Sequence, residues 1–269
     1  MMRRYAILSS TADLEYAAFL PVTMAFWTAI GYEPACIVVD DERWTSDAHR
    51  HVLDGVEKLS GLAAPMILAK PVHGFKPSTV AQVARLAAAS FPFRAEDYLL
   101  TGDADMLPLS EAWFHQQDPE ASFHVLGSDA YGTDATHFPI CYLGGTAVKW
   151  RGLMDLIPLS VGRSVERLLK DEADSWGLDE ALAERKLRHW SQRDRCQLIP
   201  RGWTQHGGYA CGRLDRGSWH LPSDLSTLID CHSVRPLSVA WPVVEKLVDY
   251  FLPPHLREFV KSYVAKLPT

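Results

Sequence analysis

The sequence is organised around residues 97–109, which read Asp97-Tyr98-Leu99-Leu100-Thr101-Gly102-Asp103-Ala104-Asp105-Met106-Leu107-Pro108-Leu109. The first part of this stretch is a short apolar run, which is typical of a buried strand. Residues two apart in an extended segment point the same way, so we expect Asp103 and Asp105 to face one cation together. Mg²⁺ and Mn²⁺ favour oxygen ligands and often keep only one or two protein carboxylates when they also bind phosphate. A solvated turn is the alternative, because aspartate is common in turns.

Short apolar runs alternate with helical patterns on the N-terminal side of this stretch. Strands are predicted at 5–9, 33–39, 66–69 and 97–102, and helices at 14–30, 47–59 and 78–89. Such alternation predicts an α/β fold with a mostly parallel, Rossmann-like central sheet that is flanked by helices. Ligands of such sheets gather at the carboxyl ends of the strands, where Ser9, Ser10, Asp40, Asp41 and the 103–105 segment lie.

The rhythm changes in the second half of the chain. Strands are predicted at 123–127 and 140–143, and helices at 147–156, 161–170 and 178–190. Residues 201–230 look like a loop, and we expect it to form a mobile or an acceptor-binding surface. From residue 243 to 267 apolar residues fall at helical spacing, with Lys246, Arg257, Lys261 and Lys266 among them. We expect these C-terminal helices to pack on their own domain, with peripheral membrane contact as the alternative.

Composition limits the classes of function. The net charge of −6 over 269 residues argues against a nucleic-acid partner. Five cysteines without a Cys-x-x-Cys pair indicate neither a disulfide framework nor a zinc ribbon, so a cytoplasmic location is expected. Neither a signal peptide nor a transmembrane helix is expected, because the apolar runs are too short. His49 and His51 are interpreted as solvated.

Several short motifs share the order found in one enzyme family. They are Leu99 to Asp105, Gln82 to Leu86 with Arg85, Cys141 to Ala147 with Gly144 and Gly145, Trp176 to Glu180, and Asp230-Cys231-His232. Together they resemble the nucleotide-sugar-dependent glycosyltransferases of the GT-A fold, whose central strand ends in an Asp-x-Asp metal motif. The resemblance implies one GT-A-like catalytic domain at 1–240, with a nucleotide-binding half at about 1–110 and an acceptor half at about 111–240. Residues 241–269 are then a helical extension packed on the same domain.

The resemblance also implies roles for individual residues. Asp103, Asp105 and His232 are expected to hold Mn²⁺ or Mg²⁺, and Asp179 or Glu180 to act as the catalytic base. The residues expected at the nucleotide-sugar donor are Ser9, Thr11, Asp40, Asp41, Arg85, Asp103, Ala104, Asp105, Gly144 and Gly145. Of these, Arg85 is expected near the diphosphate, and Gly144 and Gly145 under the donor sugar, where missing side chains let a ring approach the backbone.

The expected function is therefore metal-dependent transfer of a sugar from a nucleoside diphosphate donor, UDP favoured, to a hydroxyl acceptor such as a glycan or glycolipid. One alternative is a sugar-phosphate nucleotidyltransferase. Such enzymes carry a phosphate loop rich in glycine and arginine after the first strand, and Ser9-Ser10-Thr11-Ala12-Asp13 is not one. The other is a non-catalytic nucleotide- or carbohydrate-binding protein with a degenerate transferase site.

Overall fold

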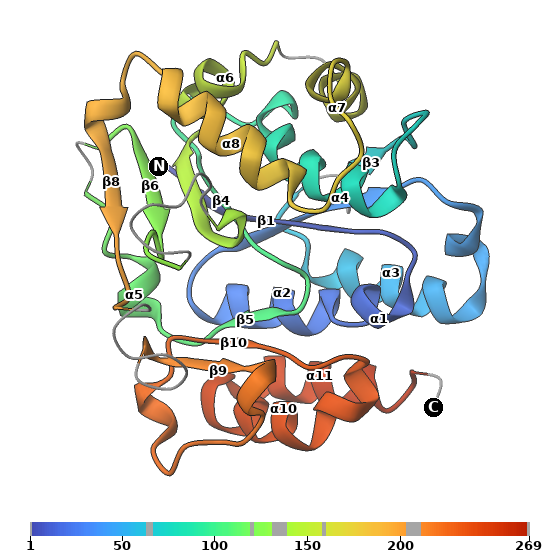
Figure 1. Cartoon of the computed structure of the whole chain (residues 1–269). Helices are drawn as coiled ribbons and strands as arrows, with labels where there is room; N and C mark the ends of the chain where they lie inside the picture. The colour runs from blue at the N-terminus through green and yellow to red at the C-terminus, as the bar shows by residue number, and fades with distance from the viewer. Residues whose placement is uncertain are drawn as a thin grey trace.

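A seven-stranded sheet forms the centre of the protein (Figure 1). The computed structural model describes residues 2–62, 67–118, 121–130, 139–157, 160–202 and 211–267. The strand order is β3-β2-β1-β4-β7-β6-β8. The strands are β1 (Arg4–Ser10), β2 (Glu33–Val39), β3 (Ile67–Ala69), β4 (Tyr98–Thr101), β6 (Phe123–Leu126), β7 (Leu143–Thr146) and β8 (Cys196–Ile199). Only β7 runs against its neighbours, β4 and β6, so the predicted mostly parallel sheet is confirmed.

Helices cover both faces of this sheet, as predicted (Figure 1). On one face lie α4 (Pro77–Leu86), α6 (Ala147–Met154), α7 (Val161–Leu169) and α8 (Leu178–His189). On the other lie α1 (Leu14–Ala17), α2 (Leu20–Ala29), α3 (Asp47–Leu59) and the short α5 (Glu111–Phe114). Strand β1 shows why two cores form: Tyr5 and Ile7 point into one of them, and Leu8 points into the other.

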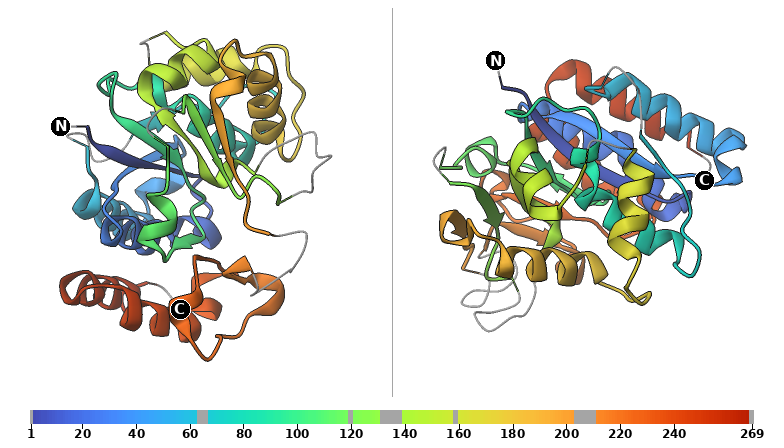
Figure 2. Two further views of the ribbon diagram at one scale, coloured as in Figure 1. Left: turned by 90° about the vertical axis from the view of Figure 1, so that its left-hand side faces the viewer. Right: turned by 90° about the horizontal axis from the view of Figure 1, so that it is seen from above.

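The last two helices, α10 (Leu237–Phe251) and α11 (Pro254–Val264), extend the second core. Figure 2 shows them as a layer beside the helices of the N-terminal third. Val244 and Val260 are completely buried, and the Tyr263 hydroxyl donates to the Ala18 carbonyl oxygen at 3.0 Å. None of the described helices combines the length and the apolar character that a membrane crossing requires.

A second, three-stranded sheet joins a strand from the middle of the chain to two strands from its C-terminal third. Its order is β5-β10-β9, and its strands are β5 (Met106–Pro108), β9 (Arg213–Asp215) and β10 (Asp230–His232). Strand β5 follows the 103–105 segment directly, so this sheet connects that segment to residues more than a hundred positions later. Neither β5 nor β9 was predicted from the sequence, and part of the expected 201–230 loop lies outside the described residues.

Three local predictions need correction. The expected helix at 14–30 is two helices, and Pro21 lies in the first turn of α2, where its missing N–H costs no hydrogen bond. The expected strand at 140–143 is wrong, because Ile140–Tyr142 form a 3₁₀ helix and the strand follows it. His49 is buried rather than solvated, with its Nε2 2.7 Å from the Ala12 carbonyl oxygen.

Candidate active site

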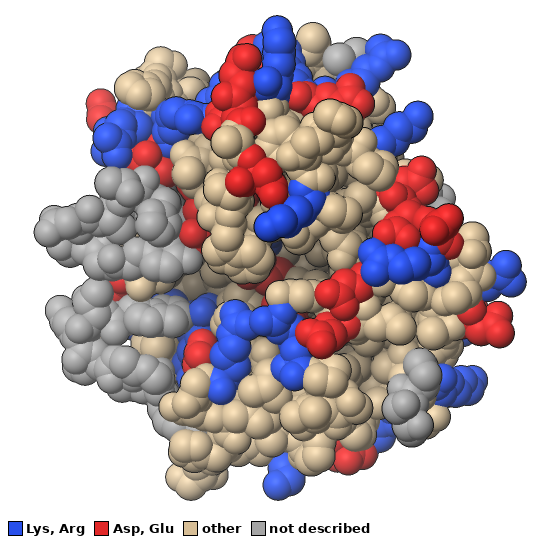
Figure 3. All heavy atoms as spheres, turned by 45° about the vertical axis from the view of Figure 1, so that its right-hand side comes forward, with Lys and Arg blue, Asp and Glu red and all other residues tan. Residues whose placement is uncertain are grey.

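A cavity of about 310 Å³ opens where β1 and β4 end. Acidic and basic side chains face one another across a hollow on the corresponding side of the molecule (Figure 3). Ser9 and Thr11 line the cavity at the end of β1, and Asp103 to Asp105 line it after β4. Helix α4, the start of α8 and the small sheet supply the other walls. This is the strand-end location where α/β sheets bind ligands.

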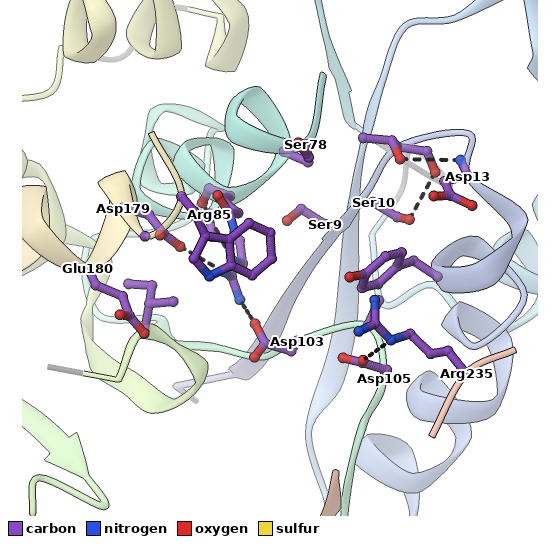
Figure 4. Close-up of a pocket in the computed structure, with 18 of the residues that line it drawn as sticks. Ser9, Ser10, Asp13, Ser78, Arg85, Asp103, Asp105, Asp179, Glu180 and Arg235 are labelled. Carbon is purple, nitrogen blue, oxygen red and sulfur yellow. Dashed lines mark hydrogen bonds and ion pairs between the residues drawn. The ribbon is translucent and has the colours of Figure 1, made fainter. Parts of the chain in front are cut away.

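The segment Asp103-Ala104-Asp105 is a turn and not an extended strand end. Its carboxylates diverge from one another, Asp103 toward Arg85 and Asp105 toward Arg235 (Figure 4). The premise that residues two apart point the same way is therefore wrong here. Both side chains nevertheless line the same cavity.

Arg85 is buried in the lining of the cavity and bridges the carboxylates of Asp103 and Asp179. Its guanidinium donates to Asp103 and, at 2.8 Å, to Asp179, and it also donates to the Gly102 carbonyl oxygen at 3.2 Å. Arg85 is only 5% exposed and Asp179 only 1%. Burial raises the pKa of Asp179, and the positive charge of Arg85 opposes this shift. The three side chains form one ionic network that joins α4 to α8.

Helix α8 presents two acidic residues to the cavity in its first turn. Gly177 caps this helix with a φ of +76°, a conformation that glycine adopts without strain. Asp179 is buried against Arg85, whereas Glu180 is partly exposed and lines the cavity. Trp176 precedes the cap and is 80% exposed at the same cavity. Of the two candidate bases, Glu180 is thus the one that solvent reaches.

His232 lies at the end of β10 and lines the same cavity. Its Nε2 is 3.8 Å from the nearer Asp105 carboxylate oxygen and 2.6 Å from a guanidinium nitrogen of Arg216. Arg235 lies 3.4 Å from the same Asp105 oxygen, and its guanidinium stacks on the Tyr16 ring at 4.1 Å. Burial raises the pKa of Asp105, and the positive charge of Arg216 opposes this shift.

Asp103, Asp105 and His232 are side chains of the chemical types that bind a divalent cation, but they are not arranged close enough together to chelate one. Among the described residues, no three His, Cys, Asp or Glu side chains lie close enough together to chelate a metal ion. Asp105, however, is 4% exposed and lies beside the cavity with its ion-pair partners at 3.4 and 3.8 Å. Charge-assisted hydrogen bonds are shorter than this, so the buried carboxylate retains capacity for a cation. Oxygen and imidazole donors together suit Mn²⁺.

The structure brings most, but not all, of the predicted site residues together. Ala104 lines the cavity with its neighbours. Outside the described lining lie Asp40, Asp41, Gly144 and Gly145. Asp41 caps a 3₁₀ helix and pairs with Arg43 at 2.7 Å. A Cβ atom on Gly144 would overlap the Tyr98 hydroxyl, so this glycine accommodates a core side chain.

Asp230 also lies away from the cavity, although it is two residues before His232. Its buried carboxylate accepts from Arg213 at 2.6 Å and from Arg201 at 2.9 Å, and the Tyr142 hydroxyl donates to it at 2.9 Å. The Asp230 carboxylate is therefore fully engaged in buried contacts away from the cavity.

Several lining residues were not predicted from the sequence. They are Asp13, Tyr16, Ser78, Ala81, Ile140, Arg216 and Arg235. Ser78, Ala81, Gln82 and Arg85 follow helical spacing, so the assignment of Arg85 to the site would have predicted this face of α4. No comparable sequence pattern links Arg235 to the site. His232 ends a strand of only three residues and Arg235 follows that strand, so neither belongs to a long periodic element.

Comparisons with known proteins give structural neighbours only. No protein-family model matches the chain, and no curated protein matches its sequence. Glycosyltransferase GlyE of Streptococcus pneumoniae TIGR4 is similar with a TM-score of 0.48 and 14% identity, over 99% of this chain and 64% of GlyE. Galactosyltransferase LgtC, solved with donor and acceptor sugar analogues, has a TM-score of 0.48 and 12% identity, over 95% of this chain and 99% of LgtC.

A third neighbour is the catalytic domain of Drosophila β1,4-galactosyltransferase 7, in complex with xylobiose. Its TM-score is 0.44 and its identity 11%, over 74% of this chain and 65% of that one. These neighbours are all glycosyltransferases. At these TM-scores and identities, the likeness carries no conclusion about what this chain binds or does.

Proposed function

We propose that the protein is a glycosyltransferase that moves a sugar from a nucleoside diphosphate donor to a hydroxyl acceptor with the help of Mn²⁺ or Mg²⁺. One observation carries the proposal: a single cavity at the strand ends gathers Asp103, Asp105 and His232 with the carboxylate of Glu180. Carboxylates and an imidazole suit a divalent cation, and a second carboxylate across the same cavity suits acid–base chemistry.

The charges around the cavity support a diphosphate ligand. Arg216 and Arg235 line the cavity together with His232. Their guanidinium groups would bind phosphate oxygens, for which arginine provides several donors in a fixed geometry. Guanidinium groups next to carboxylates that could bind a metal ion suit a ligand with two charged phosphates. We favour UDP as the nucleotide.

Asp105 and His232 would hold the cation, and Asp103 would join them if it turned away from Arg85. A bound divalent ion would act as a Lewis acid that offsets negative charge on the departing diphosphate. Ser9 and Thr11, at the end of β1, would meet the nucleotide base or ribose. The Arg85 network would hold Asp103 and Asp179 in place around the donor sugar.

Glu180 is the proposed base. In an inverting reaction its carboxylate would take the proton from the acceptor hydroxyl, and in a retaining reaction it would orient donor or acceptor. Its exposure relative to Asp179 supports this choice. Trp176, at the mouth of the same cavity, would pack its exposed ring against an acceptor sugar.

The proposal is tested by ligand binding. The protein is heated with UDP, GDP, CMP and dTDP sugars, each with and without Mn²⁺, and thermal unfolding is recorded. A donor at one hundred times its dissociation constant should add about 2.7 kcal/mol of stability. We expect one nucleotide class to stabilise the protein, and more strongly with Mn²⁺. Asp105→Asn should lose the Mn²⁺-dependent part, whereas Asp249→Asn, on the surface of α10, should keep it.

Turnover of the donor found in that screen then tests the base. Glu180→Gln should lower the chemical rate about 10²- to 10⁴-fold with little change in donor binding. Normal turnover by both Asp105→Asn and Glu180→Gln would contradict the proposal. Nucleotide binding without transfer to any acceptor would instead favour a non-catalytic binding protein.

A further inference from the structure

His232 has a defined partner on each ring nitrogen. The Nδ1 atom lies 3.4 Å from a carboxylate oxygen of Asp215, and the Nε2 atom lies 2.6 Å from Arg216. A guanidinium group can only donate hydrogen bonds, so Nε2 is the accepting, unprotonated nitrogen. In the neutral imidazole the proton is then on Nδ1, where it meets the Asp215 carboxylate.

The small sheet creates this arrangement through its register. Strand β10 pairs in parallel with β9, and His232 is directly opposite Asp215. On its other side β10 pairs antiparallel with β5, and His232 is opposite Met106, the residue after Asp105. His232 thus lies between the Asp103–Asp105 segment and Asp215, a carboxylate that is not part of the Asp-x-Asp pattern.

The Asp215 carboxylate is itself held in orientation. One of its oxygens accepts from the Gly217 backbone N–H at 3.1 Å and caps the 3₁₀ helix η6 (Arg216–Ser218). The other oxygen faces His232. The side chain is 33% exposed, so its role does not depend on deep burial.

We propose that Asp215 is the positioning residue that fixes His232 with its proton on Nδ1 and presents Nε2, beside Asp105, to a divalent cation. Arg216 holds that nitrogen when no cation is bound. This inference rests on the proposed metal dependence and deepens it. Histidines that bind metals commonly donate their other ring N–H to a carboxylate, which sets the tautomer and the ring orientation.

The arrangement also makes Arg216 a competitor of the cation. The guanidinium and a metal ion need the same lone pair on Nε2, so the ion must displace Arg216 from it. The released side chain would remain at the cavity, which it lines. Asp215 and Arg216 are neighbours in the sequence, yet their removal should change metal affinity in opposite directions.

The test measures Mn²⁺ binding by the full chain, with electron paramagnetic resonance of the free ion as readout. Asp215→Ala should weaken Mn²⁺ affinity 10- to 100-fold, the range found when such supporting carboxylates are removed. Asp215→Asn retains an acceptor for the Gly217 N–H and should also weaken binding. Arg216→Ala should strengthen it. The matched control is Asp224→Ala, because Asp224 caps the similar 3₁₀ helix η7 (Leu225–Thr227) through the Ser226 N–H at 2.9 Å.

A second readout does not require metal or activity. Long-range ¹H–¹⁵N NMR of metal-free protein should show His232 with its proton on Nδ1. Because Arg216 also favours this tautomer, the preference should persist in Arg216→Ala, be lost when Asp215→Ala is added to that variant, and be kept when Asp224→Ala is added instead. Wild-type protein with the proton on Nε2, or Asp215 variants with unchanged Mn²⁺ affinity, would overturn the inference.

These results separate it from the proposed function. Mn²⁺ binding that depends on Asp215 in a protein without sugar transfer would contradict only the function. Sugar transfer whose Mn²⁺ affinity is indifferent to Asp215 would contradict only the inference. A wild-type protein that binds no Mn²⁺ would contradict both.

Discussion

Arg85 is a buried cation with a carboxylate on either side, and such a network is sensitive to the loss of one member. Separating a buried ion from its partner leaves an uncompensated charge in a poorly solvated place. The Asp179 carboxylate is 1% exposed and has Arg85 as its ion-pair partner, so it depends on that guanidinium more than the half-buried Asp103 does.

We predict that Arg85→Met lowers the free energy of unfolding by about 3–5 kcal/mol, because it leaves Asp179 buried without its cation. Denaturant unfolding at pH 7 measures this value. The double variant Arg85→Met with Asp179→Asn should recover part of the loss, since the two residues share one interaction. Arg188→Met, which removes a surface pair with Glu184, should change stability by less than about 1 kcal/mol. Equal losses of stability in Arg85→Met and in Arg188→Met would contradict the prediction.

The sequence indicated which side chains meet in the cavity better than how they meet. Asp103 and Asp105 were predicted from their spacing on a strand, yet they lie on a turn. Their shared location follows from the apolar strand before them, which the sequence does reveal. Their separate partners, Arg85 and Arg235, come from distant elements that no local pattern links to them.

Strand β7 carries two glycines where neighbouring strands carry bulky residues. Gly144 is opposite Leu100 on β4, and a Cβ there would overlap the Tyr98 hydroxyl and lie 2.7 Å from the Cζ atom of that ring. Gly145 stands in the same relation to the Phe123 ring, with a Cβ distance of 2.7 Å. The glycines therefore serve the packing of the sheet, and the predicted contact with a donor sugar is not needed to explain them.

We predict that Gly144→Ala destabilises the protein by about 1–3 kcal/mol, the usual cost of forcing an extra methyl group into a packed core. The matched control is Gly152→Ala in helix α6, where an added Cβ meets nothing within 4 Å. Alanine there should raise stability by up to about 1 kcal/mol, because glycine disfavours a helix interior. Chemical denaturation of the two variants measures both effects. Similar stabilities of Gly144→Ala and Gly152→Ala would contradict the prediction, because they would show that a methyl group fits at residue 144.

The long strands and helices were predictable, whereas the three-residue strands of the small sheet were not. β1 and β2 are seven residues long and strongly apolar, so they stand out in the sequence. β5, β9 and β10 have three residues each, and they are strands only because they pair with one another over large sequence separations. Pairing of this kind depends on tertiary context, which composition and periodicity do not contain.

Several tyrosines are buried in the core on one side of the central sheet. Burial raises the pKa of Tyr32 to about 12, and it also raises the pKa values of Tyr98, Tyr142 and Tyr263. The folded protein therefore retains phenolic protons that the unfolded chain releases near pH 10. Stability that is fully present below pH 10 is lost as the pH rises from there toward the folded-state pKa.

We predict that the free energy of unfolding falls steadily between about pH 10 and pH 12. Tyr32→Phe should make this decline less steep, because it removes one of the retained protons. At pH 7 the same variant should lose about 1 kcal/mol, since the Tyr32 hydroxyl donates to the Phe114 carbonyl oxygen at 2.8 Å. Denaturant unfolding over a pH series measures both. A steeper decline in Tyr32→Phe than in the wild type would contradict the assigned sign.

The small sheet has a consequence for how the protein matures during synthesis. Strands β1, β2 and β4 lie within the first 101 residues, so a nascent chain can begin the large sheet early. The wall that holds His232 and Arg235 emerges from the ribosome only after more than two hundred residues, and α11, bonded to Ala18 through Tyr263, emerges later still. A nascent chain that stops before β9 and β10 thus has the strands and the aspartates but lacks one part of the cavity lining, so the complete cavity forms only after the small sheet has been synthesised.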